Sequence, residues 1–118
     1  MKKKVTIFGS TGSIGLSTLD IINQHNDKYE IVGLSINNNY EKLLEQVLAF
    51  KPKIVSIKDT DSFEKFKNRN TLKNLEILNG SDSFDDILNY ETDIVVAAIT
   101  GSAGLLPVVG AAKRGITI

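Results

Sequence analysis

The sequence predicts an α/β fold with a doubly wound parallel sheet and helices on both of its faces. Short β-branched apolar runs alternate with segments of helical spacing along the chain, a pattern typical of right-handed βαβ units. A glycine-rich segment joins the first run to the first helix, as in Rossmann-type domains. The 118 residues fall within the size range of one domain, so a single unit is expected over residues 1–118.

The first strand and helix are predicted by a change of spacing. Residues 5–8 form a nearly continuous apolar run that stops at a glycine, as a strand buried on both faces should. Helical spacing begins at Ser13 and ends in the polar stretch 24–28. The residues expected on the inner face of this helix are Ile14, Leu19, Ile21 and Ile22.

The next elements follow the same alternation. Residues 30–36 predict a second strand, and residues 40–48 carry apolar side chains at helical spacing before Pro52 closes that helix. Residues 54–57 (Ile-Val-Ser-Ile) predict a third strand. A short helix is then expected to begin at Asp61, since Glu64 three residues later completes a pattern like a capping box.

The last third of the chain repeats the pattern. A weaker strand is expected at residues 75–78 and a short helix at 83–88. Residues 93–99 predict a strand, and a helix with Pro107 in its first turns follows it. Residues 116–118 begin one more strand. Because the sequence stops inside that strand, we expect a truncated domain.

The glycine segment at residues 9–15 has the spacing G-x-x-G-x-x-G. Gly9 lets the chain turn off the strand, Gly12 lets the backbone approach a diphosphate, and Gly15 lets the helix pack tightly on the sheet. No Gly-Lys-Ser/Thr follows, so the segment is not a Walker A loop. A strand before it and a helix after it favour dinucleotide binding over a purely structural turn.

The start of this helix is also a candidate anion site. Its free N–H groups and the positive end of its dipole attract a phosphate. The hydroxyl groups of Ser10, Thr11 and Ser13 are expected to add hydrogen-bond donors.

The segment after the second strand indicates which dinucleotide binds. NAD-specific domains usually carry an acidic residue there, whereas this chain has Asn37, Asn38 and Asn39. Asparagine amides can donate to a ribose 2′-phosphate that a carboxylate would repel, which favours NADP. The three residues are equally typical of a simple turn, and both interpretations can hold. Lys42 is a possible countercharge, although a solvated lysine is the better explanation for it.

Residues 97–104 form a third candidate segment, after the strand at 93–99. Ligands of open α/β sheets lie outside the carboxyl ends of the strands, where the strand order switches, and small residues there let a cofactor approach the backbone. Close helix packing would explain the same small residues.

Composition excludes several other functions. The chain has no cysteine and a single histidine, His25, so it cannot form disulfides, thiolate sites or a zinc site built from several histidines alone. Its net charge is zero, which gives no footprint for nucleic acid or for a membrane surface. Asp82, Asp85 and Asp86 are interpreted as a solvated helix start and not as a metal site.

Three segments resemble the amino-terminal NADPH-binding domain of the 1-deoxy-D-xylulose 5-phosphate reductoisomerase family. They are the heptapeptide Gly-Ser-Thr-Gly-Ser-Ile-Gly at 9–15, Ser-Thr-Leu-Asp at 17–20, and Val-Val-Ala-Ala-Ile-Thr-Gly-Ser-Ala-Gly-Leu-Leu-Pro at 95–107. The heptapeptide alone is shared with other reductases, but the combination at this separation is specific. The resemblance extends over residues 1–118.

The resemblance implies a cytoplasmic bacterial enzyme of the non-mevalonate isoprenoid pathway. Such an enzyme rearranges the sugar phosphate 1-deoxy-D-xylulose 5-phosphate and reduces the product with NADPH to 2-C-methyl-D-erythritol 4-phosphate, using Mg²⁺ or Mn²⁺. It implies that the catalytic and metal-binding residues, and most of the homodimer interface, lie beyond residue 118. This chain would then carry the cofactor contacts and no catalytic residue or metal ligand.

The resemblance also implies which residues bind NADPH. The diphosphate contacts fall on Thr11, Gly12, Ser13 and Ile14. The contacts near the 2′-phosphate fall on Asn37, Asn38 and Asn39. Family members often have a glycine at the position of Asn37 and a basic residue at that of Asn38, so this chain departs from the pattern there.

Two other functions remain open from the sequence. The chain could be part of another small NADP reductase, although the cysteine of semialdehyde dehydrogenases and the Tyr-x-x-x-Lys of short-chain reductases are missing from these residues. It could also be a stand-alone NADP-binding sensor that performs no chemistry.

Overall fold

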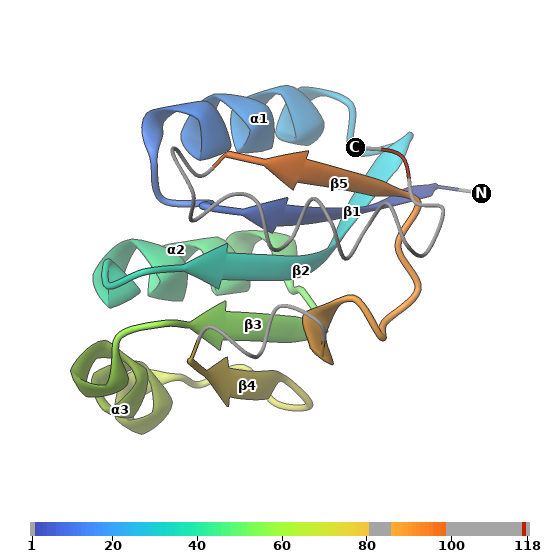
Figure 1. Cartoon of the computed structure of the whole chain (residues 1–118). Helices are drawn as coiled ribbons and strands as arrows, with labels where there is room; N and C mark the ends of the chain where they lie inside the picture. Colours follow the sequence, from blue (N-terminus) through green and yellow to red (C-terminus); the bar gives the residue numbers. More distant parts are fainter. Residues whose placement is uncertain (1, 81–85, 99–116, 118) are drawn as a thin grey trace.

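The sheet of the protein is parallel and five-stranded, with the strand order β4-β3-β2-β1-β5. The computed structural model describes residues 2–80, 86–98 and 117. In Figure 1 the five arrows lie side by side and point the same way. The strands are β1 (Lys3–Phe8), β2 (Tyr29–Ile36), β3 (Ile54–Ile57), β4 (Glu76–Asn79) and β5 (Ile94–Ala97).

The strand order reverses at β1. Strands β2, β3 and β4 extend the sheet in one direction, whereas β5 pairs with the other side of β1. Thr117 forms a single parallel bridge with Ile94, which continues the sheet beyond β5. The reversal confirms the doubly wound, Rossmann-type topology that the alternating pattern predicts. It also creates a switch point between β1 and β5, where such sheets bind ligands.

Three helices connect the first four strands. They are α1 (Ser13–Gln24), α2 (Tyr40–Phe50) and α3 (Thr60–Arg69). Helix α2 ends at Phe50, and Lys51 after it has a left-handed conformation with φ of 49°; Pro52 then prevents the helix from continuing. The expected start of the third helix at Asp61 is wrong, because Asp59 is the N-cap and its side chain accepts a hydrogen bond from Ser62 N.

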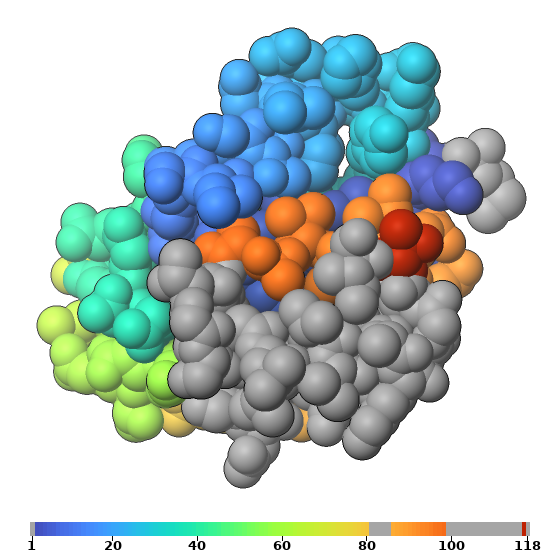
Figure 2. Space-filling view, turned by 45° about the horizontal axis from the view of Figure 1, so that its top comes forward, coloured from blue at the N-terminus to red at the C-terminus, as the bar shows by residue number. Residues whose placement is uncertain are grey.

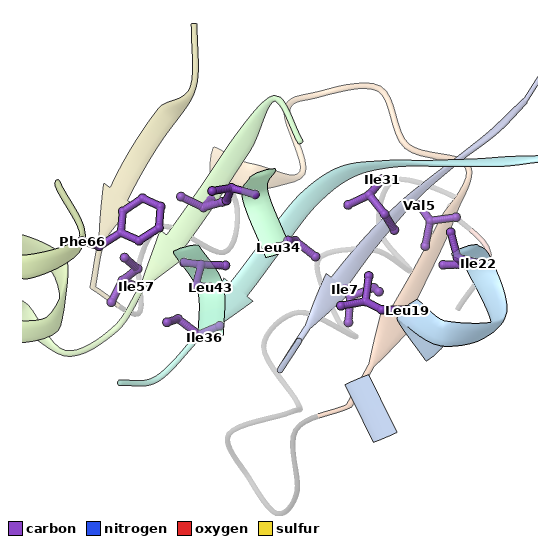
Figure 3. Packing of buried hydrophobic residues seen from close by; sticks show 12 residues of the cluster. Val5, Ile7, Leu19, Ile22, Ile31, Leu34, Ile36, Leu43, Ile57 and Phe66 are labelled. Atoms are coloured by element: carbon purple, nitrogen blue, oxygen red, sulfur yellow. The ribbon is translucent and has the colours of Figure 1, made fainter. Parts of the chain in front are cut away.

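Alternate strand residues build two apolar layers. On one face, side chains of β1, β2 and β3 pack against the helices, with Leu19 and Ile22 from α1, Leu43 from α2 and Phe66 from α3 (Figure 3). On the other face, a second cluster contains Phe8, Ile54, Val95, Ile87 and Leu88. Residues at successive strand positions thus face opposite layers, as a sheet covered on both faces requires.

The inner face of α1 differs from the expected one. Leu19 and Ile22 are buried as expected, together with Gly15, but Ile14 is 59% and Ile21 is 56% exposed. At 100° per residue, the buried stripe through Gly15, Leu19 and Ile22 turns Ile14 and Ile21 away from the sheet. The prediction that all four isoleucine and leucine side chains face inward is therefore wrong for two of them.

Parts of the expected structure lie outside the described residues. These are the first residues of the helix at 83–88, most of the small-residue segment 97–104, the helix after it, and residues 116 and 118. Asp82 and Asp85 belong to this group. Within the part of the chain that the structure describes, no helix is long and apolar enough to cross a membrane.

Candidate nucleotide-binding site

The carboxyl ends of β1, β2 and β5 meet at one edge of the sheet. Phe8, the last residue of β1, pairs with Ser35 of β2 on one side and with Ala97 of β5 on the other. The N–H groups of Gly9 and Ser10 both donate to the Ser35 carbonyl, at 2.7 and 3.1 Å. The glycine segment and the asparagine segment therefore begin next to each other, on the same side of Figure 1 as the arrowheads.

Close backbone contact fixes the glycine loop against the start of α1. Gly9 has a φ of 91°, a left-handed conformation that favours glycine. A Cβ atom at Gly15 would overlap the Gly9 carbonyl oxygen and would lie 2.7 Å from Ser10 Cα. The role predicted for Gly9 is thus seen in the structure. Gly15 does allow a close approach, but the prediction that it packs on the sheet is wrong, because the atoms it faces belong to the loop.

Gly12 is different, because neither its conformation nor its neighbours require a glycine. Its φ of −80° and ψ of 174° are extended, and an added Cβ would lie 3.7 Å from its nearest atom, Gly9 O. A side chain there would fill open space in front of the helix start. This is the space that a diphosphate approaching the backbone would occupy.

The first turn of α1 offers hydrogen-bond donors to that space. Gly12 caps the helix without a side-chain hydrogen bond. Among the described residues, the backbone N–H groups of Ser13 and Ile14 have no acceptor. Gly12, Ser13 and Ile14 are exposed and Thr11 is half-buried, so the turn that carries the positive end of the helix dipole is open to a ligand.

The side chain of Ser10 points towards α2 and not towards the open start of α1. Its side chain is fully buried, and its Oγ donates to Gln46 Oε1 of α2 at 2.8 Å. The expectation that the Ser10 hydroxyl helps to bind a phosphate is wrong, because this hydrogen bond uses its proton inside the protein. Thr11 and Ser13 remain as candidate hydroxyl donors.

Gln46 is a residue that the sequence analysis missed. Its Nε2 donates to Ser10 O at 2.9 Å while its Oε1 accepts from Ser10 Oγ. The side chain is 5% exposed and lies on the face of α2 that also buries Leu43 and Val47. The sequence does contain a signal for this residue, because Gln46 is a polar residue on the same helix face as the apolar Leu43 and Val47. A polar side chain buried there needs a hydrogen-bond partner.

The side chain of Asn39 has a structural role, whereas those of Asn37 and Asn38 are exposed. Asn39 caps α2, with its Oδ1 accepting from Lys42 N at 3.2 Å, which matches the turn interpretation. Asn37 and Asn38 are exposed, and their side chains make no hydrogen bond to the described residues. Their backbone carbonyls are used: Asn37 O accepts from Asp59 N, and Asn38 O accepts from Tyr40 N. The segment is therefore held in place while two side-chain amides stay available.

Cationic side chains surround the start of α2. Lys65 Nζ lies 5.9 Å and the Arg69 guanidinium carbon 5.4 Å from the centre of the Tyr40 ring. Lys42 Nζ lies 3.5 Å from Glu45 Oε2 on the same helix, so its charge is partly balanced. A shallow groove of about 520 Å³ runs beside the asparagines; its lining residues are Asn39, Glu41, Lys42, Leu44, Glu45 and Arg69.

Two titratable groups near this segment have shifted pKa values. Hydrogen bonds from the Ser62 hydroxyl and backbone N–H lower the pKa of the Asp59 carboxyl. The hydrogen bond to Asp61 raises the pKa of Lys65, whose Nζ lies 3.0 Å from Asp61 Oδ2. Both shifts favour the charged forms at neutral pH.

The third candidate segment begins at the end of β5. Ala97 pairs with Phe8, and Ala98 N donates to Phe8 O at 2.8 Å, so these small residues lie directly beside the glycine loop. In the space-filling view, the blue atoms of α1 adjoin the orange atoms of the β5 segment (Figure 2). Within residues 2–80, 86–98 and 117, no three histidine, cysteine or acidic side chains gather as a metal site would require.

Comparisons with known protein sequences all indicate the same enzyme family. The sequence profile of the 1-deoxy-D-xylulose 5-phosphate reductoisomerase family matches residues 5–118. The enzyme of that name from Thermoanaerobacter pseudethanolicus is 49% identical over 113 residues, which are 96% of this chain and 29% of the relative. The one from Caldanaerobacter subterraneus is 43% identical over 116 residues, or 98% of this chain and 30% of the relative.

Solved structures agree with the sequence comparison. The 1-deoxy-D-xylulose 5-phosphate reductoisomerase from Zymomonas mobilis in complex with NADPH superposes with a TM-score of 0.90 at 31% identity, over 98% of this chain and 31% of that chain. A reductoisomerase complex with NADPH, fosmidomycin and magnesium gives a TM-score of 0.89 at 36% identity, over 97% and 28%. The chain thus spans about 30% of the length of the proteins it matches.

Proposed function

The chain belongs to the 1-deoxy-D-xylulose 5-phosphate reductoisomerase family, and from this premise we propose that it is the NADPH-binding part of such an enzyme. The observation that carries the proposal is the open helix start at Gly12, which lies at the switch point between β1 and β5. A relative with this fold is described in complex with NADPH. The family membership favours this function over a stand-alone sensor or another NADP reductase.

The proposed cofactor contacts use the residues that the sequence predicts. The N–H groups of Ser13 and Ile14 and the positive end of α1 hold the diphosphate, which approaches the backbone at Gly12. The Thr11 and Ser13 hydroxyls can add hydrogen bonds. When bound, NADPH supplies a hydride for reduction of the rearranged substrate.

At the ribose end, the amides of Asn37 and Asn38 donate to the 2′-phosphate, while Asn39 keeps α2 capped and the segment in place. At the other end of the site, the small side chains of Ala97 and Ala98 leave the backbone accessible beside the loop. Each group of residues therefore binds a different part of one extended dinucleotide.

The whole enzyme's reaction is part of the proposal. We propose that it converts 1-deoxy-D-xylulose 5-phosphate to 2-C-methyl-D-erythritol 4-phosphate in the bacterial cytoplasm, as a homodimer that uses Mg²⁺ or Mn²⁺. The described residues do not fit a divalent metal, because they bring no three carboxylate or imidazole groups together. Because the chain spans about 30% of the length of its relatives, we propose that the metal, the sugar phosphate and the dimer contacts belong to the remainder of the enzyme's length.

The proposal is tested by calorimetric titration of NADPH into the chain and into the Gly12→Val variant. The wild type should bind, and the variant should fold but not bind, because its side chain fills the space in front of the helix start. Circular dichroism controls for folding. A wild type that binds no NADPH, or a folded variant with unchanged affinity, would contradict the proposal.

A further inference from the structure

We propose that Gln46 is a positioning residue for the cofactor, which holds the backbone of Ser10 so that the first turn of α1 faces the diphosphate. The inference rests on the proposed NADPH site but assigns a role to a residue that does not touch the cofactor. Gln46 lies 36 positions along the chain from Ser10, on a different helix from the one that binds the phosphate groups.

The contact between the two residues is a closed pair of hydrogen bonds. Ser10 Oγ donates to Gln46 Oε1 at 2.8 Å, and Gln46 Nε2 donates to Ser10 O at 2.9 Å. One bond fixes the side chain of Ser10 and the other fixes its peptide group. Because both residues are almost completely buried, water does not replace either bond when it is lost.

The Gln46 contact completes the support of the loop. On the β2 side, Ser35 O accepts from the N–H groups of Gly9 and Ser10. On the α1 side, Gly15 packs directly against the Gly9 carbonyl. On the α2 side, Gln46 holds Ser10. The remaining side, with Gly12 and the residues after it, is open to solvent.

Such support has a consequence for affinity. A loop that is already ordered loses little conformational entropy when a ligand binds. An apolar side chain at position 46 would fill the same space between Leu43 and Val47, but it would leave the buried carbonyl of Ser10 without a donor. We infer that the loop would then shift to satisfy this carbonyl, and that the N–H groups of Ser13 and Ile14 would lose their alignment.

The test compares Gln46→Met with a control that removes a partly buried hydrogen bond elsewhere. Thr6→Val is that control, since Thr6 is fully buried and its Oγ1 donates to Thr92 Oγ1 at 3.1 Å. Each folded protein is titrated with NADPH and with adenosine 2′-monophosphate, which lacks the diphosphate. Urea unfolding reports the stability of both variants.

The inference predicts that Gln46→Met raises the Kd for NADPH at least about fivefold, the lower bound for one buried group left unsatisfied. Its Kd for adenosine 2′-monophosphate should not change, and Thr6→Val should change neither. If Gln46→Met does not fold, Gln46→Leu replaces it, since leucine is also apolar and leaves Ser10 O without a donor. It should show the same selective loss.

Four outcomes would overturn the inference. Unchanged NADPH affinity in the folded Gln46 variant would show that the pair only stabilises the core. Equal weakening of both ligands, or equal weakening of NADPH binding by Thr6→Val, would show a general effect of stability. If the wild type binds no NADPH, the proposed function fails as well, whereas the first three outcomes leave that function intact.

Discussion

Gly15 faces the carbonyl oxygen of Gly9 so closely that a Cβ atom at Gly15 would overlap it. The third glycine of the heptapeptide is thus required by the packing of α1 on its own preceding loop. The second glycine, Gly12, has an ordinary extended conformation and open space around its α-carbon. The packing therefore requires a glycine at position 15, whereas we propose that position 12 needs one for binding.

The first prediction separates these roles by the same substitution at both positions. Gly15→Ala should lower the free energy of unfolding by about 1 to 3 kcal/mol or more, since the backbone must move to accept a Cβ. Gly12→Ala should change stability by no more than about 1 kcal/mol, because alanine adopts this conformation without strain, although glycine is the better N-cap residue. Urea unfolding of the two variants measures both effects. Equal destabilisation would show that Gly12 also has a packing role.

The second prediction concerns the choice of cofactor. Neutral amide donors give hydrogen bonds of about 0.5 to 1.5 kcal/mol each, so two bonds from Asn37 and Asn38 correspond to a preference for NADPH over NADH of about 5- to 150-fold. Asn38→Arg should tighten NADPH more than NADH and steepen the salt dependence, since its donor is charged. Asn37→Asp should weaken NADPH selectively through repulsion.

Calorimetric titration of both nucleotides into the three proteins measures this preference. We expect a modest preference for NADPH over NADH, because Glu45 partly balances the charge of Lys42, the lysine of α2 that follows the asparagine segment. Equal effects of Asn37→Asp on NADPH and NADH would indicate that the 2′-phosphate binds elsewhere.

The third prediction is a pH dependence of stability. Hydrogen bonds from Ser62 lower the pKa of Asp59 in the folded chain below its ordinary value of 3.8. The carboxylate therefore stabilises the fold above that ordinary value, and its contribution is lost as the pH falls through the lowered pKa. Asn is also a good N-cap, so Asp59→Asn removes the charge and keeps an acceptor.

Urea midpoints for the wild type and Asp59→Asn test this from neutral pH down to strongly acidic pH. The wild type should be the more stable protein at neutral pH, and the difference should disappear in acid. A difference that does not change with pH would show that the Asp59 carboxylate adds nothing beyond the cap hydrogen bond.

Most of the fold could be predicted from the sequence because the signals are local. Each strand appears as a short β-branched run and each helix as a change of period, so residues 54–57 were predicted as the strand later seen as β3. The cap of α3 was misplaced by two residues. Asp59 and Asp61 both precede the helix pattern, and only the hydrogen bonds to Ser62 distinguish them.

The site could be predicted only in part, because some of its features depend on distant contacts. The open helix start at Gly12 follows from the glycine spacing and the preceding strand. The burial of Ser10 does not, since its partner Gln46 comes from another helix. From the local sequence, each hydroxyl of the loop is an equally good candidate to bind phosphate. In the folded chain, however, the Ser10 hydroxyl is buried against Gln46.

The fourth prediction concerns catalysis by this chain alone. Because the chain spans about 30% of the length of the relatives that it matches, we expect it to bind NADPH but not to consume it when 1-deoxy-D-xylulose 5-phosphate and Mg²⁺ or Mn²⁺ are added. The absorbance of NADPH measures turnover, and the full-length Zymomonas mobilis enzyme serves as the positive control. Steady oxidation of NADPH with formation of the reduced sugar phosphate would show that catalytic groups lie within this chain.

The most direct test of the NADPH site is a titration followed by the backbone amide signals in a ¹⁵N–¹H NMR spectrum. The account predicts that NADPH shifts the signals of Gly12, Ser13 and Ile14 together with those of the asparagine segment, and leaves Ile77 and Leu78 in β4 unchanged. NADH should shift the loop signals but affect the asparagines less. Shifts that leave the start of α1 unaffected, or that centre on another edge of the sheet, would contradict it.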